Sequence, residues 1–252
     1  MQNQANSPST VNAVVVGAGG GLGTALVQAL QQRNGCRVFA LSREPHKAGG
    51  ANPTWLQADP TEPESLAHAA DTVRRQVTRV HLLAICVGIL HGGEEKPGLG
   101  PEKALSQLDG DNFRQVMTVN ALAPLQVLAA FSDLLRHDQR AVAVALSAMV
   151  GSIGDNRLGG WYSYRMSKAA LNMGLRNAAI ELNRPAGGKQ LGPIVAAIHP
   201  GTTTTPLSAP FLRRHAARPA AESAAHILDV IDRLSPDDNG AFFNWDGREL
   251  PW

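Results

Sequence analysis

A glycine-rich turn directly after a run of apolar residues constrains the fold of this chain more than any other feature. Residues 11–16 read Val-Asn-Ala-Val-Val-Val, five glycines lie within residues 17–23, and residues 22–33 then carry apolar side chains at helical spacing. This order predicts a strand, a tight turn and a helix. Glycines at such a junction allow the backbone to approach a ligand phosphate at the N-terminus of the helix. A tight turn without a ligand is the alternative interpretation.

The same alternation of strand and helix continues along the chain. Strands are predicted at 37–41, 80–87, 141–146 and 194–198, and some of them are apolar on both faces. Strands of this kind, separated by helical segments, are typical of a parallel sheet covered by helices on both sides. The sequence therefore predicts the α/β class, with a doubly wound parallel sheet of about seven strands in a single domain.

Several boundaries follow from the same pattern. Residues 1–10 are polar and are expected to be a flexible N-terminus, while 11–252 form the domain. A helix is predicted over 108–136, with a bend near Pro124. The segment 88–107 is rich in Gly, Pro and charge, and a loop of that length in a compact domain is expected at the rim of a site.

Composition narrows the classes of partner. The 23 Lys and Arg residues nearly balance the 21 acidic residues, so an affinity that rests on the nucleic-acid backbone is not expected. No apolar run approaches the length of a membrane span, and no signal peptide is recognisable at the N-terminus. Two cysteines and no cysteine or histidine cluster with ligand spacing favour a cytoplasmic protein without a metal site.

The only two tyrosines of the chain lie close to a lysine. Lys168 follows Tyr164 by four residues, so the two share a face of the predicted helix 161–183, whereas Tyr162 has Met166 at that spacing. A phenol is a poor acid-base catalyst near neutral pH, and an adjacent ammonium group is expected to lower its pKa. The pair therefore predicts a catalytic acid-base group. An exposed pair with Tyr164 packed against the domain is the alternative.

The end of the second strand bears on the choice of cofactor. An acidic residue there would accept a hydrogen bond from the adenosine ribose and repel a 2′-phosphate, but this chain has Ser42 and Arg43. A hydroxyl followed by a guanidinium group favours NADP(H), with a solvated arginine beside Glu44 as the alternative. Asp59 follows a short third strand that is predicted near 55–57, and it is expected either to accept from the adenine amino group or to cap a turn before Pro60.

Together, the turn Gly17-x-x-x-Gly21-x-Gly23 and the pair Tyr164-x-x-x-Lys168 resemble the short-chain dehydrogenase/reductase family. The order and spacing of these motifs match over nearly the whole chain. The run from Gly151 to Asn172 and the ending Asn244-Trp-Asp-Gly are similar to the C-factor branch, which is close to carbonyl reductases. The resemblance implies a Rossmann fold and a homodimer or homotetramer.

The resemblance also implies roles for individual residues. Asn120 looks like the helix asparagine that anchors a proton-relay water, and the segment from His199 to Gly201 looks like the one beside the nicotinamide carboxamide. Together with the motifs above, it gives the following expected cofactor-binding residues: Gly17, Gly21, Leu22, Gly23, Ser42, Arg43, Asp59, Gly88, Tyr164, Lys168, Pro200, Gly201, Thr202 and Thr205.

Two positions depart from the family pattern. The family's Asn-Asn-Ala-Gly after the fourth strand is replaced by Ile85-Cys86-Val87-Gly88. The usual position of the catalytic serine falls on Ala148, so we select Ser147, with Ser152 as the rival. Because a shift of one residue on a strand reverses the direction of the side chain, Ser147 can serve only if the strand has ended or bulged there.

The function that these observations predict is an NADP(H)-dependent oxidoreductase. It would transfer a hydride between the nicotinamide and the carbon of a small-molecule carbonyl or alcohol, with Tyr164 as general acid or base, Ser147 and Lys168 beside it and Asn120 holding a water. The alternative is a non-catalytic NADP(H)-binding regulatory or signalling protein of the C-factor type, because a fold does not settle a function.

Overall fold

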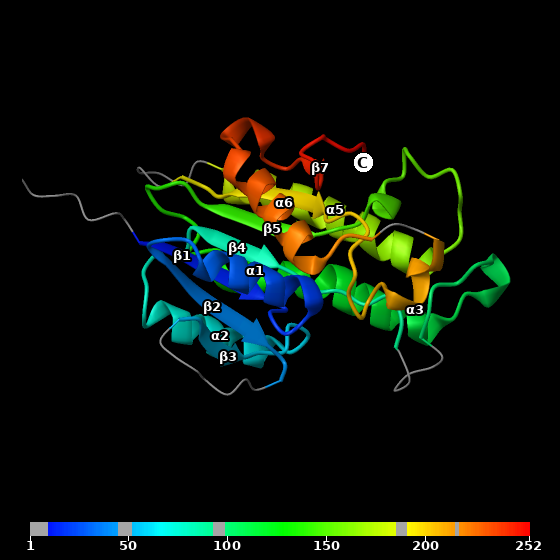
Figure 1. Ribbon diagram of the computed structural model, residues 1–252, viewed down its shortest axis with the longest axis horizontal. Helices are drawn as coiled ribbons and strands as arrows, with labels where there is room; N and C mark the ends of the chain where they lie inside the picture. The colour runs from blue at the N-terminus through cyan, green and yellow to red at the C-terminus, as the bar shows by residue number, and fades with distance from the viewer. Residues whose placement is uncertain (1–9, 45–51, 93–98, 185–190, 215–216) are drawn as a thin grey trace, which may run out of the picture.

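Seven parallel strands form one sheet in the computed structural model, which describes residues 10–44, 52–92, 99–184, 191–214 and 217–252. The strand order is β3-β2-β1-β4-β5-β6-β7, and Figure 1 shows the sheet running from β3 at the lower left to β7 near the top. The strands are β1 Val11–Val16, β2 Cys36–Ser42, β3 Thr54–Gln57, β4 Leu82–Ile85, β5 Val142–Leu146, β6 Ile194–His199 and β7 Phe242–Asn244. The predicted doubly wound α/β fold is confirmed.

Helices cover both faces of this sheet because the strands are apolar on both. Ala13 and Val15 of β1 belong to the cluster that packs against α1 and α6, whereas Val14 and Val16 belong to the cluster that packs against α2, α4 and α5. The α-helices are α1 Gly21–Gln31, α2 Pro63–Arg74, α3 Gly110–Met117, α4 Ala123–Phe131, α5 Tyr162–Leu182 and α6 Ala220–Arg233. The short helices are the π-helix η2 Thr118–Leu122 and the 3₁₀ helices η1 Leu105–Gln107, η3 Met149–Gly151, η4 Ala209–Arg214 and η5 Pro236–Asp238.

The strand order reverses between β1 and β4. From β1 the chain moves to β2 and then β3 on one side, and from β4 to β5, β6 and β7 on the other. In open α/β sheets, ligands bind beyond the carboxyl ends of the strands at this point of reversal. The turn after β1 and the segment after β4 therefore border the expected binding crevice.

The single helix predicted over 108–136 is wrong in two respects. The chain forms α3, then the five-residue π-helix η2, then α4, and α4 ends at Phe131. The irregularity precedes Pro124 because proline has no amide hydrogen for the carbonyl four residues earlier. Instead, the Ala123 amide donates to the Thr118 carbonyl, one residue further back than in an α-helix. Asn120 lies within this π-helix.

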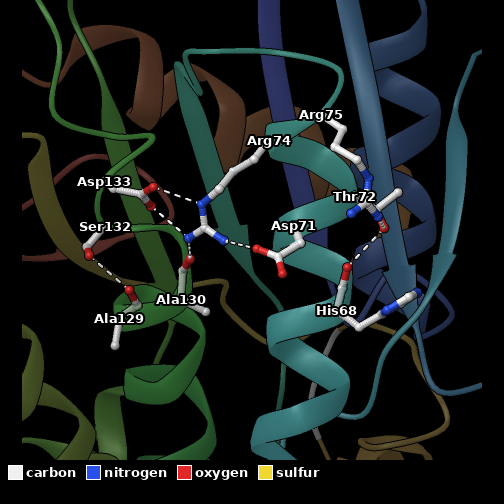
Figure 2. Close-up of polar contacts among 9 residues, drawn as sticks. All are labelled: His68, Asp71, Thr72, Arg74, Arg75, Ala129, Ala130, Ser132 and Asp133. Atoms are coloured by element: carbon white, nitrogen blue, oxygen red, sulfur yellow. Dashed lines mark hydrogen bonds and ion pairs between the residues drawn. The ribbon is translucent and has the colours of Figure 1, made fainter.

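An arginine joins α2 to the end of α4 on the outside of the molecule (Figure 2). Arg74 donates Nε to Asp133 Oδ2 at 2.8 Å and Nη2 to Asp133 Oδ1 at 2.9 Å. Its Nη2 also donates to the Ala130 carbonyl at 2.6 Å, and its Nη1 to Asp71 at 2.8 Å. The guanidinium group thus satisfies a carbonyl that the end of α4 leaves without an intrahelical partner.

Some predicted segments lie outside the described residues. These are 1–9 of the expected flexible N-terminus and 93–98 of the expected loop 88–107. Within the described ranges, no helix is long and apolar enough to cross a membrane. The same ranges contain no group of three or more His, Cys, Asp or Glu side chains placed to hold a metal ion.

Candidate functional site

A cavity of about 420 Å³ lies beyond the carboxyl ends of the strands. It opens at the reversal of strand order, between the turn after β1 and the segment after β4. The lining residues are 20–23, 43, 86–88, 91, 92, 146, 147, 164, 168, 200 and 205–207. The sequence thus brings its glycine turn and its Tyr-Lys pair to one cavity, although about 140 residues of chain separate them.

The glycine turn is packed too tightly for side chains. Gly17 has a φ of +82°, and a Cβ on it would lie 2.8 Å from the Cys86 carbonyl oxygen. A Cβ on Gly23 would lie 2.1 Å from the Gly17 carbonyl oxygen, and one on Gly21 would lie 2.8 Å from Thr205 Cγ2. The first turn of α1 contains no acidic residue, and at Gly21 and Gly23 it borders the cavity with backbone alone. Such a turn fits the pyrophosphate of a dinucleotide.

Of the three residues predicted near the adenosine end, only Arg43 lines the cavity. Ser42 is 5% exposed, and its hydroxyl donates to the Glu44 carbonyl at 2.5 Å. Asp59 Oδ1 accepts from the amide of Thr61 at 2.9 Å and from its hydroxyl at 2.7 Å, so Asp59 adopts the turn role that the sequence left open. The guanidinium of Arg43 is the group available to a 2′-phosphate here.

Tyr164 and Lys168 lie one turn apart on α5, and both line the cavity. Burial raises the pKa of Tyr164 to about 12 and lowers that of Lys168 to about 8. The pKa of Tyr164 therefore shifts in the opposite direction from the one expected from sequence. The ammonium nitrogen lies 6.0 Å from the centre of the phenol ring and donates to the Leu146 carbonyl at 2.8 Å, so burial outweighs the charge. At neutral pH the phenol carries its proton.

The two candidate serines occupy different surroundings. Ser147 follows the last residue of β5, lines the cavity and donates its hydroxyl to Asn172 Oδ1 at 2.6 Å. Ser152 donates to the Trp252 carbonyl at 3.2 Å and accepts from the Asp155 amide at 3.1 Å, and it does not line the cavity. β5 ends at Leu146, but the Ser147 amide still donates to the Ile198 carbonyl of β6 at 2.8 Å and Ala148 keeps an extended backbone, so the selection of Ser147 rests on its place in the cavity lining and stays a prediction.

Asn120 connects the segment after β4 to α5. Its side chain is fully buried, accepts from the Ile89 amide at 2.7 Å, and donates to the Ile89 carbonyl at 2.9 Å and to Ser167 Oγ at 3.0 Å. It does not line the cavity, but a Cβ on Gly88 would lie 3.4 Å from both Asn120 Oδ1 and Lys168 Nζ. Gly88 thus allows the asparagine and the lysine to approach each other behind the cavity wall.

The segment after β6 also forms part of the cavity wall. Pro200 and Thr205 line it, whereas Gly201 and Thr202 do not. Gly201 has a φ of +74°, and a Cβ there would lie 2.0 Å from the Arg218 guanidinium group. The Thr202 carbonyl accepts from the Arg218 amide at 3.0 Å. Gly201 and Thr202 therefore lie against Arg218 in the turn after β6, outside the cavity lining.

Sequence reasoning missed a set of aromatic rings beside Tyr164. The ring centres of Trp161 and Tyr164 lie 6.0 Å apart, those of Trp161 and Phe211 lie 5.2 Å apart, and those of Phe211 and His91 lie 5.9 Å apart. These rings join the start of α5, η4 and the segment after β4. Sequence reasoning also missed Glu102, which is 5% exposed and reaches the start of α5. The only signal given above was that His91 and Glu102 lie in the segment 88–107, which is expected at the rim of a site.

Comparisons with known proteins agree with this architecture. Residues 11–215 match the family described as short chain dehydrogenase. An uncharacterized oxidoreductase of Schizosaccharomyces pombe is 31% identical over 267 residues, which cover 97% of this chain and 100% of that protein. The C-signal protein of Myxococcus xanthus is 38% identical over 149 residues, which cover 59% of this chain and 84% of that protein.

Among solved structures, the NADPH-bound carbonyl reductase from chicken fatty liver superposes with a TM-score of 0.82 at 27% identity. The match covers 97% of this chain and 95% of that chain. A putative short-chain dehydrogenase/reductase from Burkholderia multivorans with bound NADP matches with a TM-score of 0.74 at 25% identity, over 96% and 100% of the two chains.

Proposed function

Because the chain belongs to the short chain dehydrogenase family, we propose that it is an NADP(H)-dependent oxidoreductase that interconverts a small-molecule carbonyl compound and its alcohol. The observation that carries this proposal is the shared cavity. Tyr164, Lys168 and Ser147 line the same space as the glycine turn and Arg43. Cofactor binding alone would not require a phenol in the cavity lining at this position.

The choice of NADP(H) as the proposed cofactor rests on the charge at the end of the cavity that would hold the adenosine. Arg43 lines the cavity there, and Asp59 is turned into its own loop, so no carboxylate among the described lining residues would oppose a 2′-phosphate. A guanidinium group binds phosphate oxygens in a bidentate manner. The NADPH-bound and NADP-bound relatives support the same choice.

In the proposed reaction, each residue of the cavity has a defined task. The nicotinamide supplies or accepts the hydride. In the reductive direction Tyr164 donates its phenolic proton to the carbonyl oxygen, and the Ser147 hydroxyl orients that oxygen after rotating away from Asn172 Oδ1. Lys168 holds the nicotinamide ribose and stabilises the phenolate that remains. Asn120 lies behind the cavity wall, and there it would anchor the water through which a proton returns to Tyr164.

The test measures NADPH oxidation with a panel of aldehydes, ketones and quinones. We expect turnover by the natural protein and its loss in Tyr164→Phe, with NADPH binding retained. Tyr162→Phe is the matched control, because it removes the other tyrosine from the same helical turn. Turnover that survives in Tyr164→Phe would contradict the role of the phenol. NADPH binding without turnover on any substrate would favour the regulatory alternative.

We also propose that the protein forms a homodimer through the outer face of α5. Met166, Met173 and Ile180 recur at seven-residue spacing and are 49%, 63% and 52% exposed, and Leu122 of η2 is 50% exposed. A cavity of about 310 Å³ lies between α4 and α5. A contiguous apolar face of this kind is typical of an interface. Sedimentation of Met173→Glu should give a smaller species than that of the natural protein, and an unchanged species would contradict this interface.

A further inference from the structure

The helix that carries Tyr164 begins without a capping side chain of its own. The residue in the N-cap position of α5 is Trp161, whose side chain makes no cap hydrogen bond, and the first turn contains no acidic residue. Trp161 has a φ of +53°, the only positive φ among the non-glycine residues that the structure describes. A bulky residue rarely adopts this conformation, so the surrounding contacts must hold it.

A distant carboxylate supplies the missing cap. Glu102 lies 61 residues before Ser163, and its Oε2 accepts from the Ser163 amide at 3.0 Å. Its Oε1 accepts from the Ser163 hydroxyl and, at 2.6 Å, from Asn112 Nδ2. The Glu102 backbone carbonyl also accepts from the Trp161 amide. Glu102 therefore satisfies two backbone donors at the start of α5 that no residue of the helix can satisfy.

The carboxylate is buried but remains ionised. Glu102 is 5% exposed, and burial on its own would raise its pKa. The hydrogen bonds from Ser163, from its own backbone amide and from Asn112 outweigh burial and hold the pKa of Glu102 below its ordinary value. Its partners are neutral groups and the positive end of α5, so the negative charge complements the helix dipole rather than a cation.

The residues that Glu102 contacts lie directly next to Tyr164. Ser163 precedes Tyr164 in the chain, and the Trp161 ring meets the Tyr164 ring edge to face, with an angle of 76° between the ring planes. Gly160 allows the close approach of the Glu102 segment, because a Cβ there would lie 3.4 Å from the Lys103 carbonyl oxygen. The backbone on one side of Tyr164 and the ring against it are thus both fixed by Glu102.

We propose that Glu102 is a positioning residue for Tyr164. It acts on Tyr164 through its contacts with Ser163 and Trp161. This inference rests on the proposed function, in which Tyr164 donates the proton. It explains why a strained tryptophan is maintained next to the cavity. It also gives the segment around residue 102 a role in the site, although Glu102 does not line the cavity.

The principal test is Glu102→Gln. Glutamine replaces one acceptor oxygen with a donor, so at least one of the three donors of Ser163 and Asn112 loses its partner. We expect kcat to fall about tenfold or more, because a small displacement of a catalytic group has an effect of this size. The Kd of NADPH should stay unchanged, since Glu102 lies away from the glycine turn and Arg43.

The matched control is Asp109→Asn. Asp109 caps α3 by accepting from the amides of Asp111 and Asn112, and it is exposed. This variant also replaces a capping carboxylate with an amide, but at a helix that does not carry Tyr164. It should leave both Tm and kcat nearly unchanged, because asparagine caps a helix about as well as aspartate. An equal loss of kcat in the two variants would overturn the proposal.

A double variant tests whether the hydrogen bonds themselves matter. In Glu102→Gln/Asn112→Asp the amide and the carboxylate exchange places, so the introduced glutamine can accept from the Ser163 amide and donate to the introduced carboxylate. We expect this variant to recover most of the lost kcat. A double variant with the kcat of Glu102→Gln alone would contradict the assignment.

A spectroscopic readout separates this inference from the proposed function. The chain has two tyrosines, so Tyr162→Phe assigns the ring resonances of Tyr164 in an NMR spectrum. These resonances should shift in Glu102→Gln, because the Trp161 ring moves, and should stay in place in Asp109→Asn. If the natural protein turns over no substrate, the proposed function fails while this spectrum still decides the role of Glu102. Tyr164 resonances that do not shift in Glu102→Gln would overturn the assignment of Glu102 as a positioning residue.

Discussion

The two halves of the cavity are built in different ways. The half that we propose for the cofactor, the cofactor half, consists of residues 20–23, 43 and 86–88, and four of these residues are glycines. The half that we propose for the substrate, the substrate half, consists of residues 91, 92, 147, 164 and 205–207, with Trp161 and Phe211 packed beside it. The shape of the cofactor half depends on how closely main-chain segments approach one another. The shape of the substrate half depends on how side chains from three distant segments pack together.

This difference determines how each half should respond to substitution. The Gly17 carbonyl oxygen leaves no room for a Cβ on Gly23, and a main-chain atom cannot rotate away as the end of a side chain can. A wall of side chains can re-pack around a smaller residue at moderate cost. We therefore expect large, uniform effects from the cofactor half and smaller, substrate-dependent effects from the substrate half.

The largest effect is expected for Gly23→Ala. Its Cβ would lie 2.1 Å from the Gly17 carbonyl oxygen, so the turn must open. Overpacking of this kind costs about 1–3 kcal/mol, and because NADPH binding needs the closed turn, the Kd for NADPH should rise roughly 5- to 150-fold. Fluorescence titration with NADPH measures it. Gly100→Ala is the control, because a Cβ there meets nothing within 4 Å. Unchanged NADPH affinity in Gly23→Ala would show that the turn does not bind the cofactor.

A smaller and selective effect is expected for Arg43→Asp. The variant removes the guanidinium group from the 2′-phosphate end and adds an acceptor for a ribose hydroxyl. A hydrogen bond to a charged group contributes about 1.5–3 kcal/mol, so the Kd of NADPH should rise about tenfold or more. The Kd of NADH should fall in the same titration. A parallel weakening of both cofactors would indicate damage to the turn instead of a lost phosphate contact.

The two halves also differ in how far the sequence predicts them. The spacing of Gly17, Gly21 and Gly23 after an apolar strand predicts the cofactor half, because local geometry and the carboxyl edge of a parallel sheet fix it. The Tyr164 and Lys168 pair is predictable for the same reason, since helical spacing places both on one face. The direction of the Tyr164 pKa shift is not, because burial depends on the packed structure.

The substrate half lies beyond such local rules. Nothing in the spacing of Trp161, Phe211 and His91 indicates that their rings meet, because three separate loops bring them together. Glu102 reaches Ser163 across 61 residues, so no local capping pattern reveals it. The π-helix around Asn120 was likewise predicted as a regular helix with a bend. Tertiary packing decides each of these features.

Phe211→Ala should change substrate selection by a small factor. Phe211 packs against Trp161 and His91, and an aromatic pair contributes about 0.5–1.5 kcal/mol beyond its buried area. We expect KM for bulky apolar carbonyl compounds to rise a few-fold, with KM for the smallest aldehydes and the Kd of NADPH unchanged. Steady-state kinetics across the substrate panel measures this. An equal rise for every substrate would indicate a general loss of structure rather than a selective wall.

The smallest effect is expected far from both halves, at the Arg74 network of Figure 2. The side chains of Arg74 and Asp133 are 34% and 57% exposed, and pairs in such surroundings contribute at most about 1 kcal/mol. Arg74→Gln should therefore lower Tm by about 2–4 °C and leave kcat and the Kd of NADPH unchanged.

The pH dependence of the stability lost in Arg74→Gln identifies which contact of Arg74 is responsible. The hydrogen bonds from Arg74 hold the pKa of Asp133 below its ordinary value of 3.8. A carboxyl group with a lowered pKa in the folded state contributes stability above its unfolded pKa, and this contribution disappears as the pH falls through the folded pKa. The difference in stability between Arg74→Gln and the natural protein should thus be present at neutral pH and shrink as the pH falls below 3.8. Urea unfolding at a series of pH values measures it. A difference that does not depend on pH would assign the effect to the contact of Arg74 with the Ala130 carbonyl, which carries no titratable group.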